Sequence, residues 1–261
     1  SLMNADGILA SLLWICLGLL LASALARSTR AATLGWGLFS LFWLGKIGHY
    51  LDIKDYVNVV LFFVVSLLCL YMAWTVRKRG LYCRPCYWAG YAAAVCGLIY
   101  FPFALIPTLQ TGLIAFTTSI TASILQSLSI PVVLESWNMM SLNGRSVQII
   151  LACTAIESIA LFAGLILSVQ APPRRKLAAL AASTLSIYGL NIIRNGFVIM
   201  AYGWSWFGEN SFDIAHNLIA KIGSAAALLA VSYLVFLLLP ELLSIIDELA
   251  AEIKPRRGDA A

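Results

Sequence analysis

Charged side chains are scarce in this sequence. Only 11% of its 261 residues are Asp, Glu, Lys or Arg, whereas 61% are hydrophobic, and the mean hydropathy is +0.90. A soluble domain of this length needs far more polar surface, which excludes that class of protein. The composition predicts a polytopic membrane protein instead.

Histidine and paired metal ligands are also scarce. The only histidines are His49 and His216. The motif Cys83-Arg84-Pro85-Cys86 has the spacing of half a zinc site, but no further Cys or His pair lies at ligand spacing. We therefore expect no metal ion and no organic cofactor. Internal repeats and low-complexity segments are not apparent.

The net charge of +5 comes mainly from short basic runs. These runs are Arg27 with Arg30, Arg77-Lys78-Arg79 with Arg84, Arg174-Arg175-Lys176, and Lys254 with Arg256 and Arg257. Because the runs flank apolar stretches, they indicate membrane topology. We do not expect nucleic-acid binding.

Seven apolar stretches approach the roughly 20 residues that a helix needs to cross the hydrocarbon core. They are 7–26, 33–51, 56–76, 87–106, 152–170, 177–202 and 215–239. The predicted fold is therefore an all-α membrane protein with about seven transmembrane helices.

An eighth stretch, 109–128, is rich in Thr, Ser and Gln, and its apolar residues recur at helical spacing. This pattern is typical of a helix that lies in the membrane interface. If the stretch were a span, Arg174-Arg175-Lys176 would lie on the opposite side from Arg77-Lys78-Arg79. The positive-inside rule thus favours an interfacial helix, with residues 110–150 at the outer face.

An outer β-hairpin is predicted next. Residues 130–134 and 147–150 are apolar and flank Asn143-Gly144, a dipeptide that favours a type I′ turn. After the last span, apolar residues at helical spacing predict an amphipathic cytoplasmic tail helix.

These elements predict a single membrane domain with four successive parts. The parts are the four N-terminal spans in 1–107, the outer interfacial helix and hairpin in 108–151, a catalytic half with three spans in 152–239, and the cytoplasmic tail in 240–261.

Three reactive side chains converge in this topology. Cys153 opens an apolar segment, Arg194 lies deep in the next span, and His216 opens the last one. A helix N-terminus and a neighbouring histidine both favour a nucleophilic thiolate, and an arginine can stabilise an oxyanion. Cys153 alone is more often a packing residue, but the three together predict a cysteine-nucleophile enzyme whose active site faces outward.

The residues Ala152-Cys153-Thr154, Asn191-Ile192-Ile193-Arg194 and His216 resemble the exosortase/archaeosortase family. The resemblance covers roughly the C-terminal half of the chain. It implies a membrane cysteine transpeptidase in the cell membrane that acts on secreted proteins. Their C-terminal sorting signal consists of a short motif, an apolar helix and a basic tail. The enzyme cleaves at the motif and passes the new carboxyl end to a membrane lipid or surface acceptor.

The sequence departs from the commonest exosortase pattern, Cys-Ser-Gly, because it reads Cys153-Thr154-Ala155. Without the glycine, the turn after the nucleophile is less permissive. Threonine after the cysteine is more frequent in archaeosortases, whereas His216 matches the histidine of the exosortase pattern. Bacterial or archaeal subfamily therefore stays open.

Four further polar residues are candidates for supporting roles or substrate binding. Glu157 lies one turn deeper than the cysteine and needs a partner, for which the intramembrane arginine is the candidate. Asn191 either holds that arginine or the substrate backbone, or makes a hydrogen bond between helices. Asp213 is expected to cap the last helix, with orientation of the imidazole as the alternative. Thr154 follows the nucleophile directly.

Three alternatives remain beside the transpeptidase. His49 is a rival base near another outer span end. Cys83 and Cys86 have the spacing of a thiol–disulfide oxidoreductase linked to a quinone, although the basic loop places them on the cytoplasmic side. A non-enzymatic transporter or assembly factor would use Arg194 and Glu157 as a structural pair.

Overall fold

The computed structural model of the protein describes residues 2–80 and 84–253. The chain forms two compact units, and each is described by itself. The first consists of Ser1–Leu98, Leu167–Gln170 and Glu241–Ala261, and the second of Ile99–Ile166 and Ala171–Pro240.

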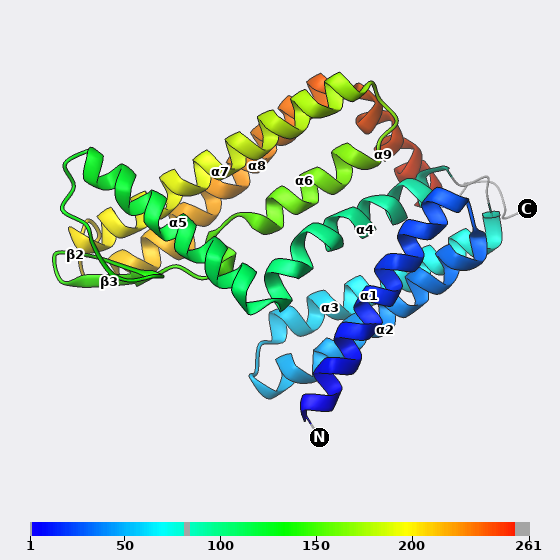
Figure 1. Cartoon of the computed structure of the whole chain (residues 1–261), viewed down its shortest axis with the longest axis horizontal. Coiled ribbons are helices and arrows are strands. Elements are labelled where there is room, and N and C mark those ends of the chain that lie inside the picture. The colour runs from blue at the N-terminus through cyan, green and yellow to red at the C-terminus, as the bar shows by residue number, and fades with distance from the viewer. Residues whose placement is uncertain (1, 81–83, 254–261) are drawn as a thin grey trace, which may run out of the picture. The chain divides into compact units, whose positions relative to one another are not determined.

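Helices from both ends of the chain build the first unit (Figure 1). It contains α1 (Leu2–Ala26), α2 (Thr29–Asp52), α3 (Tyr56–Arg79), most of α4 (Arg84–Leu105) and nearly all of α9 (Pro240–Ile253). Ser28 and Asp55 are the N-cap residues of α2 and α3. The side chain of each accepts a hydrogen bond from a backbone N–H of the first turn. The predicted tail helix corresponds to α9.

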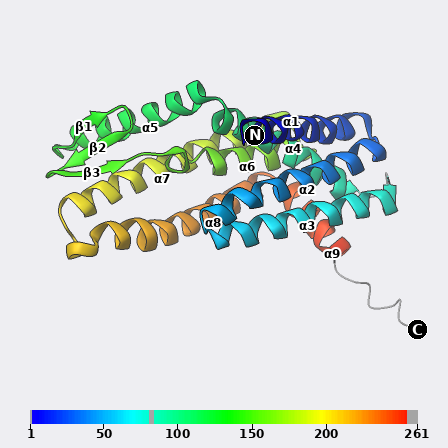
Figure 2. The same ribbon diagram turned by 90° about the horizontal axis from the view of Figure 1, so that it is seen from below.

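Helices and one small sheet build the second unit. Its helices after α4 are α5 (Pro107–Ser127), α6 (Ile156–Ser168), α7 (Pro173–Gly203) and α8 (Ala220–Leu238). Short helical turns lie at Leu151–Cys153, Gly208–Asn210 and Asp213–Ile219. Figure 2 shows α7 and α8 as an antiparallel pair, with α5 and the sheet along the C-terminal part of α7.

The sheet confirms the predicted turn and corrects the predicted strands. Asn143 and Gly144 both have positive φ, 52° and 76°, as a type I′ turn requires. They join β2 (Met139–Leu142) to β3 (Arg145–Gln148), and β1 (Val133–Ser136) pairs with the other edge of β2. A two-residue turn must connect the strands directly beside it, so the predicted strand at 130–134 could not be the partner of 147–150.

The all-α membrane fold is confirmed, with seven spans as an approximate count. Among the described residues, six helices are long and apolar enough to cross a membrane. They are Gly7–Ala26, Tyr56–Arg79, Arg84–Leu105, Pro107–Ser127, Pro173–Gly203 and Asp213–Leu238. The predicted span at 152–170 contains only the 13-residue helix α6, and the span predicted at 33–51, within α2, is also outside this set.

The helix α5 corresponds to the stretch that the sequence assigned to the membrane interface, and that assignment stays a prediction. Its polar stripe, which includes Thr117, Thr118 and Thr121, is buried within the second unit. The hydroxyls of Thr118 and Thr121 donate to carbonyls one turn earlier, at 2.8 and 2.7 Å. Self-satisfied hydroxyls cost little in an apolar environment, so the stripe does not mark a water-facing side. By length and composition α5 is a candidate span.

Candidate active site

Cys153 is the last residue of the 3-10 turn Leu151–Cys153. The side chain is 8% exposed and belongs to an apolar cluster that includes Leu125, Met140 and Ile199. The helix α6 begins only at Ile156. This corrects the expectation that the cysteine opens the helix itself: the thiol lies one short turn ahead of its N-terminus.

Two asparagines of α7 hold the backbone of Cys153. The Nδ2 of Asn191 donates to the Cys153 carbonyl at 2.7 Å, and the Nδ2 of Asn195 donates to the same oxygen at 3.0 Å. Of the roles predicted for Asn191, the one nearest to the structure is a hydrogen bond between helices. Its side chain donates from α7 to the short turn that precedes α6. We missed Asn195, although its spacing of four residues from Asn191 places both on one helix face.

Replacing Asn191 and Asn195 by leucine, singly and together, is expected to give non-additive losses of stability. Each single change leaves the Cys153 carbonyl one donor and costs about 1 kcal/mol in the free energy of unfolding. The double change leaves that carbonyl unpaired, which adds about 1 to 3 kcal/mol beyond the sum. Denaturant titration of each variant in detergent measures the free energy of unfolding. Asn217→Leu, at an exposed position, is the control, and strictly additive losses would contradict the shared role.

Thr154 and Ala155 shape the turn after the cysteine. The Thr154 hydroxyl donates to the Leu151 carbonyl at 2.7 Å, so this buried residue closes the turn. Ala155 has a φ of 62°, the left-handed region that a residue with a Cβ disfavours. The missing glycine of the Cys-Ser-Gly pattern thus corresponds to a strained alanine.

Ala155→Gly is expected to raise the melting temperature by about 2 to 4 °C, because glycine adopts the left-handed region without the roughly 1 kcal/mol penalty. Ala160→Gly, inside α6, is the matched control and should lower the melting temperature, because glycine weakens a helix interior. Thermal unfolding in detergent compares the two. A lower melting temperature for both variants would show that the turn gains nothing from glycine.

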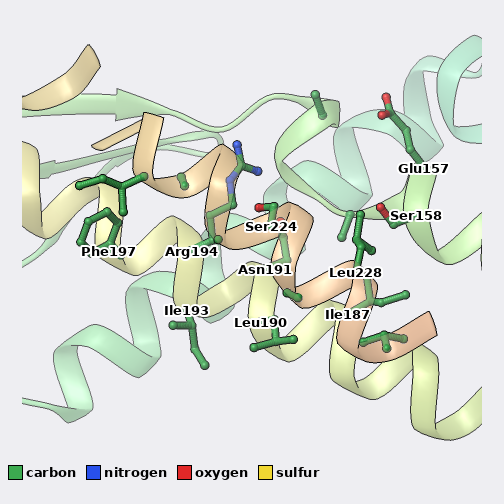
Figure 3. Close-up of a pocket in the computed structure, with 17 residues that line it drawn as sticks. Glu157, Ser158, Ile187, Leu190, Asn191, Ile193, Arg194, Phe197, Ser224 and Leu228 are labelled. Atoms are coloured by element: carbon green, nitrogen blue, oxygen red, sulfur yellow. The ribbon is translucent and has the colours of Figure 1, made fainter. Parts of the chain in front are cut away.

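Arg194 lines a cavity of about 390 Å³ formed by α6, α7, α8 and the segments next to them. In Figure 3, Asn191 and Arg194 project from α7, and Ser224 and Leu228 come from α8. The Nε of Arg194 is buried and has no hydrogen-bond partner among the described residues. An unpaired buried donor is costly unless a ligand satisfies it. Most of the other lining residues are apolar, and Ser224 is a polar one that the sequence did not single out.

Glu157 is not paired with Arg194, contrary to the expectation. Its carboxylate accepts a hydrogen bond from the Tyr100 hydroxyl at 3.4 Å, and Figure 3 places it across the cavity from the guanidinium. Glu157 lies in the first turn of α6, where the positive end of the helix dipole stabilises a carboxylate. The two charges therefore line the same cavity without neutralising each other directly.

His216 lies in the π-helical turn Asp213–Ile219, which leads into α8. Its ring stacks on that of Phe212, with centroids 5.2 Å apart and an interplanar angle of 12°. Arg194, Lys221 and Asp213 are the charged side chains whose fields reach it. π-Helical turns are frequent at functional sites, and this one places the imidazole within the electrostatic reach of the cavity arginine.

Asp213 does not cap the last helix, contrary to the favoured expectation. It lies in the first turn of the π-helical segment, which has no side-chain cap, and its Oδ1 accepts from the Nδ2 of Asn217 at 3.2 Å. Among the described residues, no hydrogen bond joins the Cys153 thiol to His216. The structure thus ties Cys153 to the helix of Arg194 through the two asparagines, and relates His216 to Arg194 by charge.

The two rival sites, His49 and the pair Cys83 and Cys86, lie in other parts of the chain. His49 lies in the last turn of α2, in the first unit, and its ring meets Tyr50 edge to face at 5.3 Å. Cys86 is buried in the first turn of α4, whereas Cys83 lies outside the described residues. The oxidoreductase hypothesis therefore stays an untested prediction.

Comparison with known proteins identifies the family. A family model described as transmembrane exosortase matches residues 4–235. Archaeosortase A of Haloferax volcanii is 30% identical, over 93% of this chain and 93% of that protein. Archaeosortase A of Natronomonas pharaonis is 28% identical, over 91% of this chain and 87% of that protein. No solved structure matches. With the match covering nearly its whole length, this chain belongs to the transmembrane exosortase family.

Proposed function

We propose that this protein cleaves the C-terminal sorting signal of secreted proteins through a thioester acyl-enzyme and transfers the new carboxyl end to a lipid or surface acceptor. The coarser class, a membrane transpeptidase, follows from family membership. Beyond that class, we propose the kind of substrate, the thioester intermediate and the acceptor.

The observation that carries it is the pair of hydrogen bonds from Asn191 and Asn195 to the Cys153 carbonyl. Because both donors belong to α7, they fix the cysteine backbone relative to Arg194, which lies between them in sequence. A nucleophile held this way keeps its geometry when substrate binds, and small misplacements at a reacting centre are expensive in rate.

Three residues then share the chemistry. The Sγ of Cys153 attacks the scissile carbonyl carbon as its proton passes to His216. Arg194 stabilises the oxyanion. The carbon–nitrogen bond breaks, the leaving amine takes the proton, and a thioester remains. The acceptor nucleophile, deprotonated by His216, attacks the thioester and releases the thiol. The contact between Cys153 and His216 forms when substrate closes the site, as is common for catalytic hydrogen bonds.

The cavity suits an apolar helix whose polar end meets Arg194 and Asn191, whereas Cys153 and His216 are not among its lining residues. Ala220, Gly223 and Ala227 form a wall of small residues from the start of α8, and small residues let helices approach closely within a membrane. Arg194 and Asn191 supply donors at the same cavity. We place the scissile bond at the outer membrane boundary, with the substrate's basic tail inside, because the basic runs of the chain predict that topology.

Alkylation of Cys153 by a membrane-impermeant thiol reagent tests the site and its orientation together. We expect labelling from outside, faster as pH rises, slowed by His216→Ala and blocked by a bound sorting-signal peptide. Cys153→Ala identifies the labelled residue, because labelling that persists in this variant comes from another cysteine, such as the partly exposed Cys96. If an active preparation labels only from the cytoplasmic side, the outward-facing site is wrong. If a saturating peptide leaves the rate unchanged, Cys153 is not at the substrate site.

A further inference from the structure

A second cavity lies within the first unit and is made of residues that the proposed chemistry does not use. Its volume is about 560 Å³. It is formed by the end of α1, the first described turns of α4, Ser168, Gln170 and one residue of α9. The described residues that line it include two arginines and three aromatic side chains but no Asp or Glu. These five are Arg27, Arg84, Tyr87, Trp88 and Tyr91.

The two arginines give this cavity a positive field that no carboxylate among the described lining residues offsets. Arg84 lies in the first described turn of α4, on the same helix as Tyr87, Trp88 and Tyr91. A guanidinium presents a planar fork of N–H donors that matches the oxygens of a phosphate. The charge and the donor geometry both favour a phosphate group as the ligand.

The backbone at Arg27 shows that the local fold alone does not favour this residue. Arg27 follows the end of α1 with a φ of 50°, and the backbone N–H of Ser28 donates to the Ser23 carbonyl at 3.2 Å. This is the arrangement that usually has glycine at the left-handed position. Because a Cβ is disfavoured there, the guanidinium is the feature of this residue that the cavity can use.

The aromatic residues place the cavity at a membrane boundary. Tyr and Trp concentrate where the bilayer meets water, and both arginines belong to basic runs predicted to be cytoplasmic. The Tyr87 hydroxyl lies 3.1 Å from the Thr29 Oγ1, which holds its ring in place. Trp88 is 8% exposed, and its Nε1 has no hydrogen-bond partner among the described residues. Ala24 and Ile245 add an apolar edge.

We propose that Arg27 and Arg84 bind a phosphate group in this cavity, at the cytoplasmic boundary of the membrane. Two sources supply that chemistry: the headgroup of an anionic membrane lipid and free phosphate. Basic pockets between membrane helices are suited to lipid headgroups, and the apolar edge would then contact the acyl chains. The site is independent of the proposed transpeptidase chemistry.

Native mass spectrometry of the purified full-length chain in a neutral detergent tests the site. The added probes are phosphatidylglycerol, inorganic phosphate, and diacylglycerol, which has acyl chains but no phosphate. We expect Arg27→Gly/Arg84→Gln to weaken binding of the phosphate-bearing probe about 25-fold, because each arginine near a phosphate contributes roughly a factor of five. Arg30→Gln/Arg77→Gln removes the same charge from basic residues that do not line the cavity, and should leave binding unchanged.

The glycine at position 27 separates binding from folding. Because glycine suits the left-handed backbone there, Arg27→Gly alone should keep or raise the melting temperature while weakening binding. Phosphatidylglycerol bound at the arginines and not displaced by excess phosphate identifies a lipid ligand. Inorganic phosphate that binds alone and competes identifies a free phosphate. Equal weakening in both double variants, or diacylglycerol binding as well as phosphatidylglycerol, would overturn the proposal.

Discussion

Cys153→Ala is expected to reduce cleavage of a co-expressed sorting-signal substrate by a factor on the order of 10³ or more. Without the thiol no thioester forms, and the remaining groups can only bind the substrate. The measurement is the ratio of processed to unprocessed substrate in membranes with equal amounts of each variant. Cys69→Ala, which removes another buried thiol, is the control and should process substrate normally.

Cys153→Ser adds a second comparison. A hydroxyl preserves the size and the backbone hydrogen bonds of the site but is a far weaker nucleophile near neutral pH. We expect normal substrate binding with almost no cleavage. Processing by Cys153→Ala at the wild-type rate would end the transpeptidase mechanism and leave Cys153 as a packing residue of its apolar cluster.

Arg194→Gln is expected to lower kcat by a factor of about 10² to 10³, with a smaller effect on KM. An arginine that acts on the oxyanion contributes mainly in the transition state, so its loss appears in kcat. Arg194→Lys keeps the charge but loses the planar fork of donors, and should recover only part of the rate. Steady-state cleavage of a fluorescent sorting-signal peptide in detergent separates the two constants.

The matched control is Arg145→Gln in the same unit. Arg145 donates to the Tyr202 carbonyl at 3.2 Å and lies over the Tyr202 ring, but does not line the cavity. We expect a loss of stability with kcat nearly unchanged. If Arg194→Gln instead raises KM with kcat intact, Arg194 binds the substrate and the oxyanion needs another donor. If Arg194→Gln and Glu157→Gln abolish function while Cys153→Ala does not, the non-enzymatic alternative gains support.

Local patterns predicted much of the fold. Apolar runs of sufficient length predicted the membrane class, because a helix must satisfy its own backbone in lipid. Asn143-Gly144 predicted its turn, since few residues adopt two successive left-handed conformations. The missing glycine after Cys153-Thr154 pointed to a less permissive turn, and Ala155 is indeed left-handed.

Only the tertiary structure decided the partners of the polar groups. Glu157 bonds with Tyr100 and not with Arg194, and Asn195 joins Asn191 at the Cys153 carbonyl. The threonine face of α5 turned out to be buried. Spacing along a sequence determines which residues share a helix face, because that depends on local backbone geometry. Which neighbour meets that face depends on how segments far apart in the chain pack, and spacing contains no information on it.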